Sequence, residues 1–136
     1  MPIEAKVLDT FESSLARCNA NPAFLPRFYE IFRASSPKVR DKFARTNFDR
    51  QNAALRASFD LVLEAARGGS QNRDRMLDIA ERHSSRDLNI GAELYDLWLD
   101  SLLAAVKEYD PVHNSSVNDA WEQVMMAGIQ VMLRHY

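Results

Sequence analysis

The chain has 136 residues and a net charge of −2, from 17 lysine and arginine residues against 19 aspartate and glutamate residues. Neither sign of charge forms a long block, so the composition gives no support to a nucleic-acid partner or to a polybasic membrane contact. The hydrophobic share of 46% is ordinary for a globular protein, and the length fits one domain over 1–136 with its own core.

The single cysteine, Cys18, leaves no disulfide framework and no cysteine metal cluster. The start of the chain is acidic and amphipathic, without the basic residues and apolar run of a secretion signal. No stretch approaches the ~20 apolar residues that a membrane-spanning helix needs. We therefore expect a cytoplasmic protein that does not enter the membrane.

The first helix is predicted over residues 4–18. Its apolar residues fall at every fourth position and form one stripe: Ile3, Val7, Phe11 and Leu15. Pro22 is well placed to open a second helix, which we expect to end near residue 34. This second helix is apolar around much of its circumference, which is typical of a helix at the centre of a fold.

The next break predicts a short helix and then a long one. Ser36 is expected to cap the short helix, with Pro37 as its first residue and its end near residue 43. Residues 46–49 offer another cap before a long helix, which residues 68–70 end because they contain two glycines and a serine.

Three further helices are predicted at 73–85, at 92–109 and from 116 to the end of the chain. Residues 116–119 resemble a capping box, with Asp119 in place of the usual glutamate. No run of alternating apolar and polar residues, typical of a half-buried strand, is present. The sequence therefore predicts an all-α single domain of six to eight helices.

The functional interpretation depends on His83. Met76, Ala80 and His83 share one face of their helix, and Leu77 lies beside them. A buried imidazole needs a partner for each ring nitrogen, because an unpaired buried polar group costs about 1–3 kcal/mol. This stretch leaves two interpretations open: a core histidine bonded to backbone or to Tyr95, and a histidine that ligates iron or zinc.

Several motifs, in their order along the chain, resemble bacterial globins: FYEIF, PKVRDKF, DRQNAAL, IAERHSS, ELYDLWLDSLLAAV and a late tryptophan helix. The chain is similar to single-domain globins and to the haem domain of flavohaemoglobins from about Ala23 to Tyr136. The most specific piece is IAERHSS, with Tyr95 twelve residues after His83. The resemblance implies a globin fold around a pocket for haem b (iron protoporphyrin IX).

Carried over residue by residue, the resemblance makes His83 the proximal ligand of the haem iron. It makes Phe43 the phenylalanine that packs against the haem plane. Tyr29 and Gln51 match the distal tyrosine and glutamine, whose hydrogen bonds would hold a bound gas. Leu55, one turn after Gln51, matches the apolar wall of the distal side.

Two further residues complete the implied haem site. Tyr95 would lie beside the proximal histidine, and Met132 of the last helix would contact the haem. Flexible core packing is the alternative for all three methionines of that helix: Met125, Met126 and Met132. Core filling is likewise the alternative for Tyr29 and Phe43, and solvent exposure is the alternative for Gln51.

Two features depart from the flavohaemoglobin pattern. Only eight positions separate Phe43 from Gln51, so Asn52 and Leu55 are alternatives for the distal position. Flavohaemoglobins also have a glutamate in the last helix that joins the proximal histidine and the tyrosine, and Tyr136 falls about where that acid should be. Without it, the imidazole is expected to be less anionic and to activate oxygen less strongly.

The function that the resemblance implies is reversible binding of a diatomic gas, O₂ and also NO or CO, at iron held by His83. If the protein turns over, the expected reaction is NO dioxygenation to nitrate, with electrons from a separate reductase. The alternative is a haem-based gas or redox sensor that acts through a partner protein, and a third is an interaction module that has lost haem. Monomer and homodimer stay open.

Overall fold

The computed structural model describes residues 3–68, 70–86 and 88–136. Within these ranges the backbone forms helices and no strand, in this order: α1 (Ala5–Asn19), α2 (Phe24–Ser35), α3 (Pro37–Lys42), α4 (Phe48–Ala66), α5 (Ser70–His83), α6 (Ala92–Tyr109) and α7 (Ser115–Arg134). The predicted all-α fold is confirmed, and seven described helices agree with the expected six to eight. None of the described helices combines the length and the apolarity that a membrane crossing needs.

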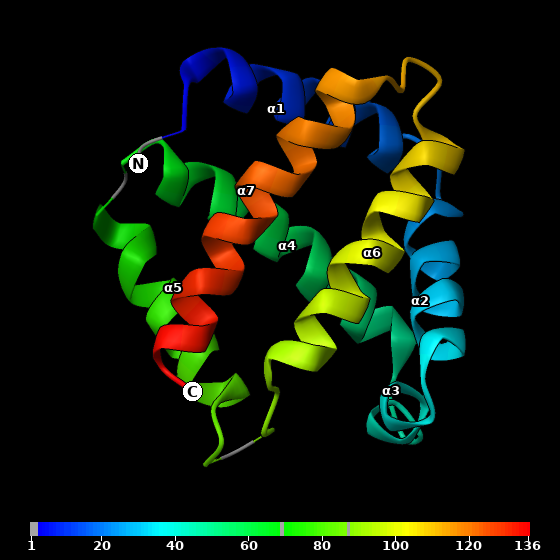
Figure 1. Ribbon diagram of the computed structural model, residues 1–136, viewed down its shortest axis with the longest axis vertical. Helices are drawn as coiled ribbons and strands as arrows, with labels where there is room; N and C mark the ends of the chain where they lie inside the picture. The colour runs from blue at the N-terminus through cyan, green and yellow to red at the C-terminus, as the bar shows by residue number, and fades with distance from the viewer. Residues whose placement is uncertain (1–2, 69, 87) are drawn as a thin grey trace.

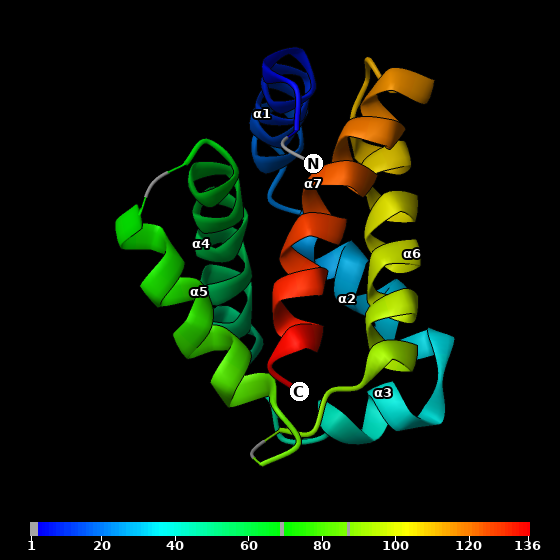
Figure 2. The same ribbon diagram turned by 60° about the vertical axis from the view of Figure 1, so that its left-hand side comes forward.

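Helix α7 packs against four other helices. It contacts α1, α4, α5 and α6, and it lies between α5 and α6 in both views (Figure 1 and Figure 2). The second helix, α2, packs mainly on α6 and also contacts α3 and α4. At the lower end of both views, α3, the start of α4, the end of α5 and the start of α6 gather. Segments far apart in the sequence therefore meet at this end of the molecule.

Side chains near two predicted breaks start the helices as the sequence indicates. Ser36 caps α3 by accepting from the Lys38 N–H (3.2 Å), and Pro37 is the first helical residue. Asn47 caps α4 in the same way, since its side-chain oxygen accepts from the N–H three residues later (3.2 Å). Phe43, the residue that follows α3, lies between these two caps.

The predicted start of α2 at Pro22 is wrong. The helix begins at Phe24, because the Asn21 side chain accepts from the Ala23 N–H (2.9 Å) and closes a local turn around the proline. An asparagine that bonds two residues ahead competes with the first helical turn. Pro22 therefore belongs to the connection.

The capping box predicted at 116–119 is also wrong. Helix α7 begins at Ser115, and Asn114 is its cap, with its side-chain oxygen accepting from the Val117 N–H (2.9 Å). Asparagine is as effective a cap as serine, so the earlier residue starts the helix.

Trp121 of α7 is fully buried and joins three other helices. Its ring makes edge-on contacts with Phe11 of α1 (ring centroids 4.7 Å apart), Phe59 of α4 (5.5 Å) and Phe24 of α2 (6.2 Å). The indole N–H donates to the Ser14 hydroxyl (2.8 Å), so the polar end of this large ring has a partner.

A polar network ties α1 to the end of α6. The buried carboxylate of Asp110 accepts from the Ser14 hydroxyl (2.6 Å), from Arg17 Nε (2.7 Å) and Nη2 (2.9 Å), and from the Val112 N–H (2.8 Å). Burial would raise the pKa of Asp110, but these hydrogen bonds and the Arg17 charge outweigh it and lower the pKa to about 2. The C-terminal ends of α1 and α6 lie at the upper end of Figure 1. The end of α5, the start of α6 and α3 lie at the lower end.

Candidate functional site

Three aromatic residues from three segments meet where α2, α3 and α4 come together. The ring of Tyr29, on α2, lies 5.5 Å from that of Phe43, which ends α3, and 5.3 Å from that of Phe48, which begins α4. The rings of Phe43 and Phe48 are 5.9 Å apart. We call Tyr29, Phe43 and Phe48 the aromatic cluster.

The sequence predicts Tyr29 and Phe43 as site residues, and the structure brings them into contact. Phe48, which is not among the predicted site residues, joins them. One signal could have identified it: Phe48 precedes Gln51 by three positions, so the two lie about one helical turn apart on α4.

The Gln51 side chain lies close to the Tyr29 hydroxyl. Burial raises the pKa of Tyr29 to about 12, although the nearby Gln51 amide lowers it in part. The phenol is therefore protonated at neutral pH and keeps its O–H as a donor. Tyr29 is only 2% exposed, so this donor lies inside the protein.

The two alternatives to Gln51 for the distal position differ from it. Leu55 is buried and apolar, one turn further along α4. The side-chain oxygen of Asn52 is buried and has no hydrogen-bond partner among the described residues. The geometry thus pairs Gln51, rather than Asn52, with Tyr29.

His83 is the last residue of α5 and is half-buried. Its Nδ1 lies 2.8 Å from the carbonyl oxygen of Ile79, one turn earlier in the same helix. A carbonyl can only accept, so Nδ1 carries the proton, and a neutral ring then has its free lone pair on Nε2. Within the described part of the chain, Nε2 makes no hydrogen bond.

The prediction that the face of α5 with His83 points into the core is confirmed in part. Met76 and Ala80 are buried as predicted. Leu77, expected beside them, is 37% exposed, because one helical step of about 100° turns it away from the core. The structure thus gives His83 a backbone partner for one nitrogen and no bond to Tyr95.

Tyr95, on α6, is 8% exposed, and burial raises its pKa to about 12. Its buried hydroxyl has no partner among the described residues. A buried hydroxyl without a partner lowers stability by about 1–3 kcal/mol. A bound molecule that offers it a hydrogen-bond acceptor would therefore stabilise the protein. Met132 of α7 is half-buried and packs against the core.

Tyr136 contacts the segment that follows His83, not the imidazole itself. Its carbonyl accepts from the Ser85 N–H (3.0 Å) and hydroxyl (2.7 Å), and its phenol O–H donates to the side chain of Asn89. No carboxylate is bonded to His83 among the described residues. The only partner seen for its ring there is an uncharged carbonyl, which makes an imidazole less electron-rich than a carboxylate partner does.

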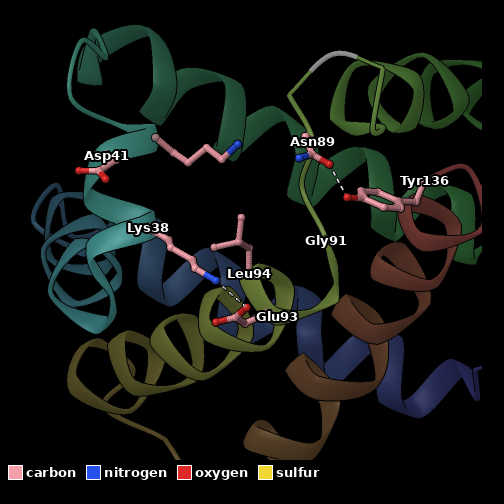
Figure 3. A pocket seen from close by; sticks show the side chains of 8 residues that line it. Lys38, Asp41, Asn89, Gly91, Glu93, Leu94 and Tyr136 are labelled. Carbon is pink, nitrogen blue, oxygen red and sulfur yellow. Dashed lines mark hydrogen bonds and ion pairs between the residues drawn. The ribbon is translucent and has the colours of Figure 1, made fainter.

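A pocket of about 570 Å³ opens between α3, the segment before α6 and Tyr136 (Figure 3). None of the predicted site residues lines it, but Lys42 and Leu94 do, and each immediately precedes a predicted residue. The Lys42 ammonium donates to the Leu88 carbonyl (2.8 Å), and Lys38 pairs with Glu93 (3.3 Å). The pocket therefore adjoins the segments that carry Phe43 and Tyr95.

A solved structure identifies the fold. The chain superposes with a TM-score of 0.91 on the crystal structure of a protein from Pseudomonas aeruginosa PAO1 that is structurally highly homologous to a human hemoglobin. The two sequences are 41% identical, over 96% of this chain and 98% of that chain. The chain belongs to the globin family. Searches with protein-family models and among the curated proteins give no match.

In this globin three of the predicted site residues come together: the Phe43 ring contacts the Tyr29 ring, and the Gln51 side chain lies close to the Tyr29 hydroxyl. His83, on α5, has one free ring nitrogen, and Tyr95, on α6, has a hydroxyl without a partner among the described residues. The described residues hold no group of three histidine, cysteine, aspartate or glutamate side chains suited to a metal ion. A haem iron would need fewer ligands from the protein than a free metal ion does, because the porphyrin supplies the others.

Proposed function

We propose that this globin is a haem protein that binds a diatomic gas, O₂ and also NO or CO, at iron held by Nε2 of His83. The observation that carries the proposal is the hydrogen bond from His83 Nδ1 to the Ile79 carbonyl. This bond leaves the Nε2 lone pair free and orients the ring, which is the usual arrangement of a histidine that ligates a metal. When bound, the haem supplies ferrous iron with one coordination position open to gas.

The residues that would hold the haem are Phe43, Leu55, Tyr95 and Met132. Phe43 and Leu55 offer apolar surface, and both belong to or adjoin the buried core. The unpartnered hydroxyl of Tyr95 supports the fit, because a bound group with an acceptor would satisfy it. Haem b is the form we propose, since the sequence has one cysteine and therefore no paired thiols for covalent attachment.

Tyr29 and Gln51 would stabilise the bound gas. The pKa of Tyr29, near 12, keeps its phenol protonated, and the Gln51 amide offers a second donor next to it. Donors make stronger hydrogen bonds to an acceptor with partial negative charge, which a gas held by the haem would offer. The uncharged partner of His83 favours gas binding over strong oxygen activation.

We further propose NO detoxification as the physiological reaction, in keeping with the similarity of the sequence motifs to the haem domain of flavohaemoglobins. In NO dioxygenation, O₂, NO and one electron give nitrate. The electron would come from a separate reductase. The chain's own part would be to hold O₂ through Tyr29 and Gln51 and to keep bulk water out with the aromatic cluster.

Visible absorption spectra of the ferric, ferrous and ferrous–CO protein test this proposal. The wild type should show a sharp Soret band that shifts with CO. His83→Ala should weaken or lose it, and added imidazole should restore it. His135→Ala is the matched control, because His135 is exposed at the end of α7, and its spectra should equal those of the wild type.

A wild type that stays colourless after haemin is supplied would contradict haem binding and point to an interaction module. If haem binds, NO consumption by the oxygenated protein with an added reductase tests the reaction. Rapid loss of NO with stoichiometric nitrate supports detoxification. Slow loss would contradict it and favour a sensor.

A further inference from the structure

Arg33 stands out among the charged residues of α2. It lies one turn after Tyr29, is half-buried, and donates from Nε to the Tyr29 carbonyl oxygen (3.3 Å). Arg27 on the same helix pairs with Glu30 and Glu108, whereas Arg33 pairs with no carboxylate in the described part of the chain. What the Arg33 guanidinium contacts instead is an aromatic ring.

The guanidinium carbon of Arg33 lies 4.5 Å from the ring centroid of Phe48. That distance is within the range of a cation–π interaction, and a planar guanidinium covers an aromatic face better than an ammonium does. Phe48 is the first residue of α4 and contacts Tyr29. Through the Phe48 ring, Arg33 therefore contacts the start of α4, the helix that carries Gln51.

This link matters because α2 and α4 have few other points of contact: α2 packs mainly on α6. Tyr29 lies on α2, and Gln51, close to its hydroxyl, lies in the first turn of α4. The distance between their side chains therefore depends on how the first turn of α4 lies against α2. Arg33 is the polar residue that spans the same two helices beside it.

We propose that Arg33 is a positioning residue for the gas-binding side of the site. It stacks on Phe48 and so holds the first turn of α4 against α2, which keeps the donors of Tyr29 and Gln51 together. The inference rests on the proposed function, since it assigns the residue that tunes how long a bound gas is held. It predicts that loss of the guanidinium speeds gas release without removing haem.

The test is the O₂ dissociation rate of the haem-loaded protein, measured by stopped flow. Arg33→Met keeps the apolar stem and removes the cation, and it should raise the rate about two- to fivefold, which is what a cation–π contact at a partly exposed site supports. Arg33→Lys should recover part of the wild-type rate. Arg27→Met is the matched control on the same helix and should leave the rate unchanged.

A double-mutant comparison identifies the route through Phe48. Phe48→Leu should speed O₂ release to a similar extent, and adding Arg33→Met to it should speed release little further, because the shared contact is already lost. Equal and additive effects would overturn the proposed route. Melting temperatures of all variants separate a general loss of stability from a change in release rate.

The outcomes also separate this inference from the proposed function. A haem-loaded Arg33→Met protein with the wild-type O₂ dissociation rate overturns the role of Arg33 and leaves haem binding intact. A wild type that binds no haem overturns the proposed function, and this role of Arg33 falls with it. The contact itself has an independent readout: the NMR signals of the Arg33 side chain should be shifted by the Phe48 ring current and should lose that shift in Phe48→Leu.

Discussion

Replacement of Asp110 by asparagine should destabilise the fold without touching the candidate site. The carboxylate accepts four hydrogen bonds, three of them from the side chains of Ser14 and Arg17. An asparagine of the same shape lacks the charge and keeps one acceptor atom. Arg17 is 30% exposed and can turn to water, so we do not expect the full penalty of an isolated buried charge.

The magnitude follows from the pKa of Asp110. It is lowered from 3.8 to about 2, and at about 1.4 kcal/mol per pKa unit the difference corresponds to about 2.5 kcal/mol of stability. Because the folded-state pKa lies below the unfolded one, this stability is present above about pH 4 and is lost as the pH falls toward 2. Because proton binding and folding are linked, about half of this stability is lost by pH 3.

Urea denaturation at pH 7 and pH 3 measures both quantities. Asp110→Asn should be less stable than the wild type by about 2 kcal/mol at pH 7 and by about half as much at pH 3. Asp60→Asn, at an exposed position of α4, is the control and should change neither value. Protein and haem concentrations must be equal throughout, since a bound cofactor raises apparent stability by mass action.

Two results would refute this reasoning. A loss below about 0.5 kcal/mol at pH 7 would mean that the hydrogen bonds of Asp110 only offset the cost of burying its charge. An equal loss at both pH values would mean that the effect comes from shape, not from charge. Visible spectra of Asp110→Asn should match those of the wild type, because the network lies at the opposite end of the fold.

Three further predictions follow from single contacts. Tyr29→Phe should speed O₂ dissociation about tenfold or more by stopped flow, because a donor to a partly charged acceptor is lost; an unchanged rate would contradict its distal role. Asn89 has φ 55°, so Asn89→Ala should be about 1 kcal/mol less stable in urea than Asn89→Gly, although both lose the bond to Tyr136. A methyl group added at Gly128 would lie 3.3 Å from Val62, so Gly128→Ala should be more favourable in a Val62→Ala background than alone, and additive effects would argue against that contact.

Much of the fold could be predicted because it depends on neighbours in the sequence. Periodic apolar residues give the helices, and Ser36 and Asn47 cap them through bonds to residues two or three positions away. The starts predicted at Pro22 and at residue 116 are misplaced because the Asn21 and Asn114 side chains bond the backbone nearby. The helix predicted from residue 73 also starts earlier, at Ser70. The candidate role of His83 depends on a bond to Ile79, which is also local.

The contacts of the site that could not be predicted depend on packing between segments that are distant in the chain. The approach of Gln51 to Tyr29, the stacking of Arg33 on Phe48 and the network of Asp110 each bring different segments together. No spacing rule fixes such pairs, because the crossing of two helices sets which side chains meet. The sequence by itself thus determined the helices, their approximate ends and the candidate histidine ligand, His83. Tertiary structure decided the partners of those residues, since burial and hydrogen bonding depend on neighbours that only the folded chain brings together.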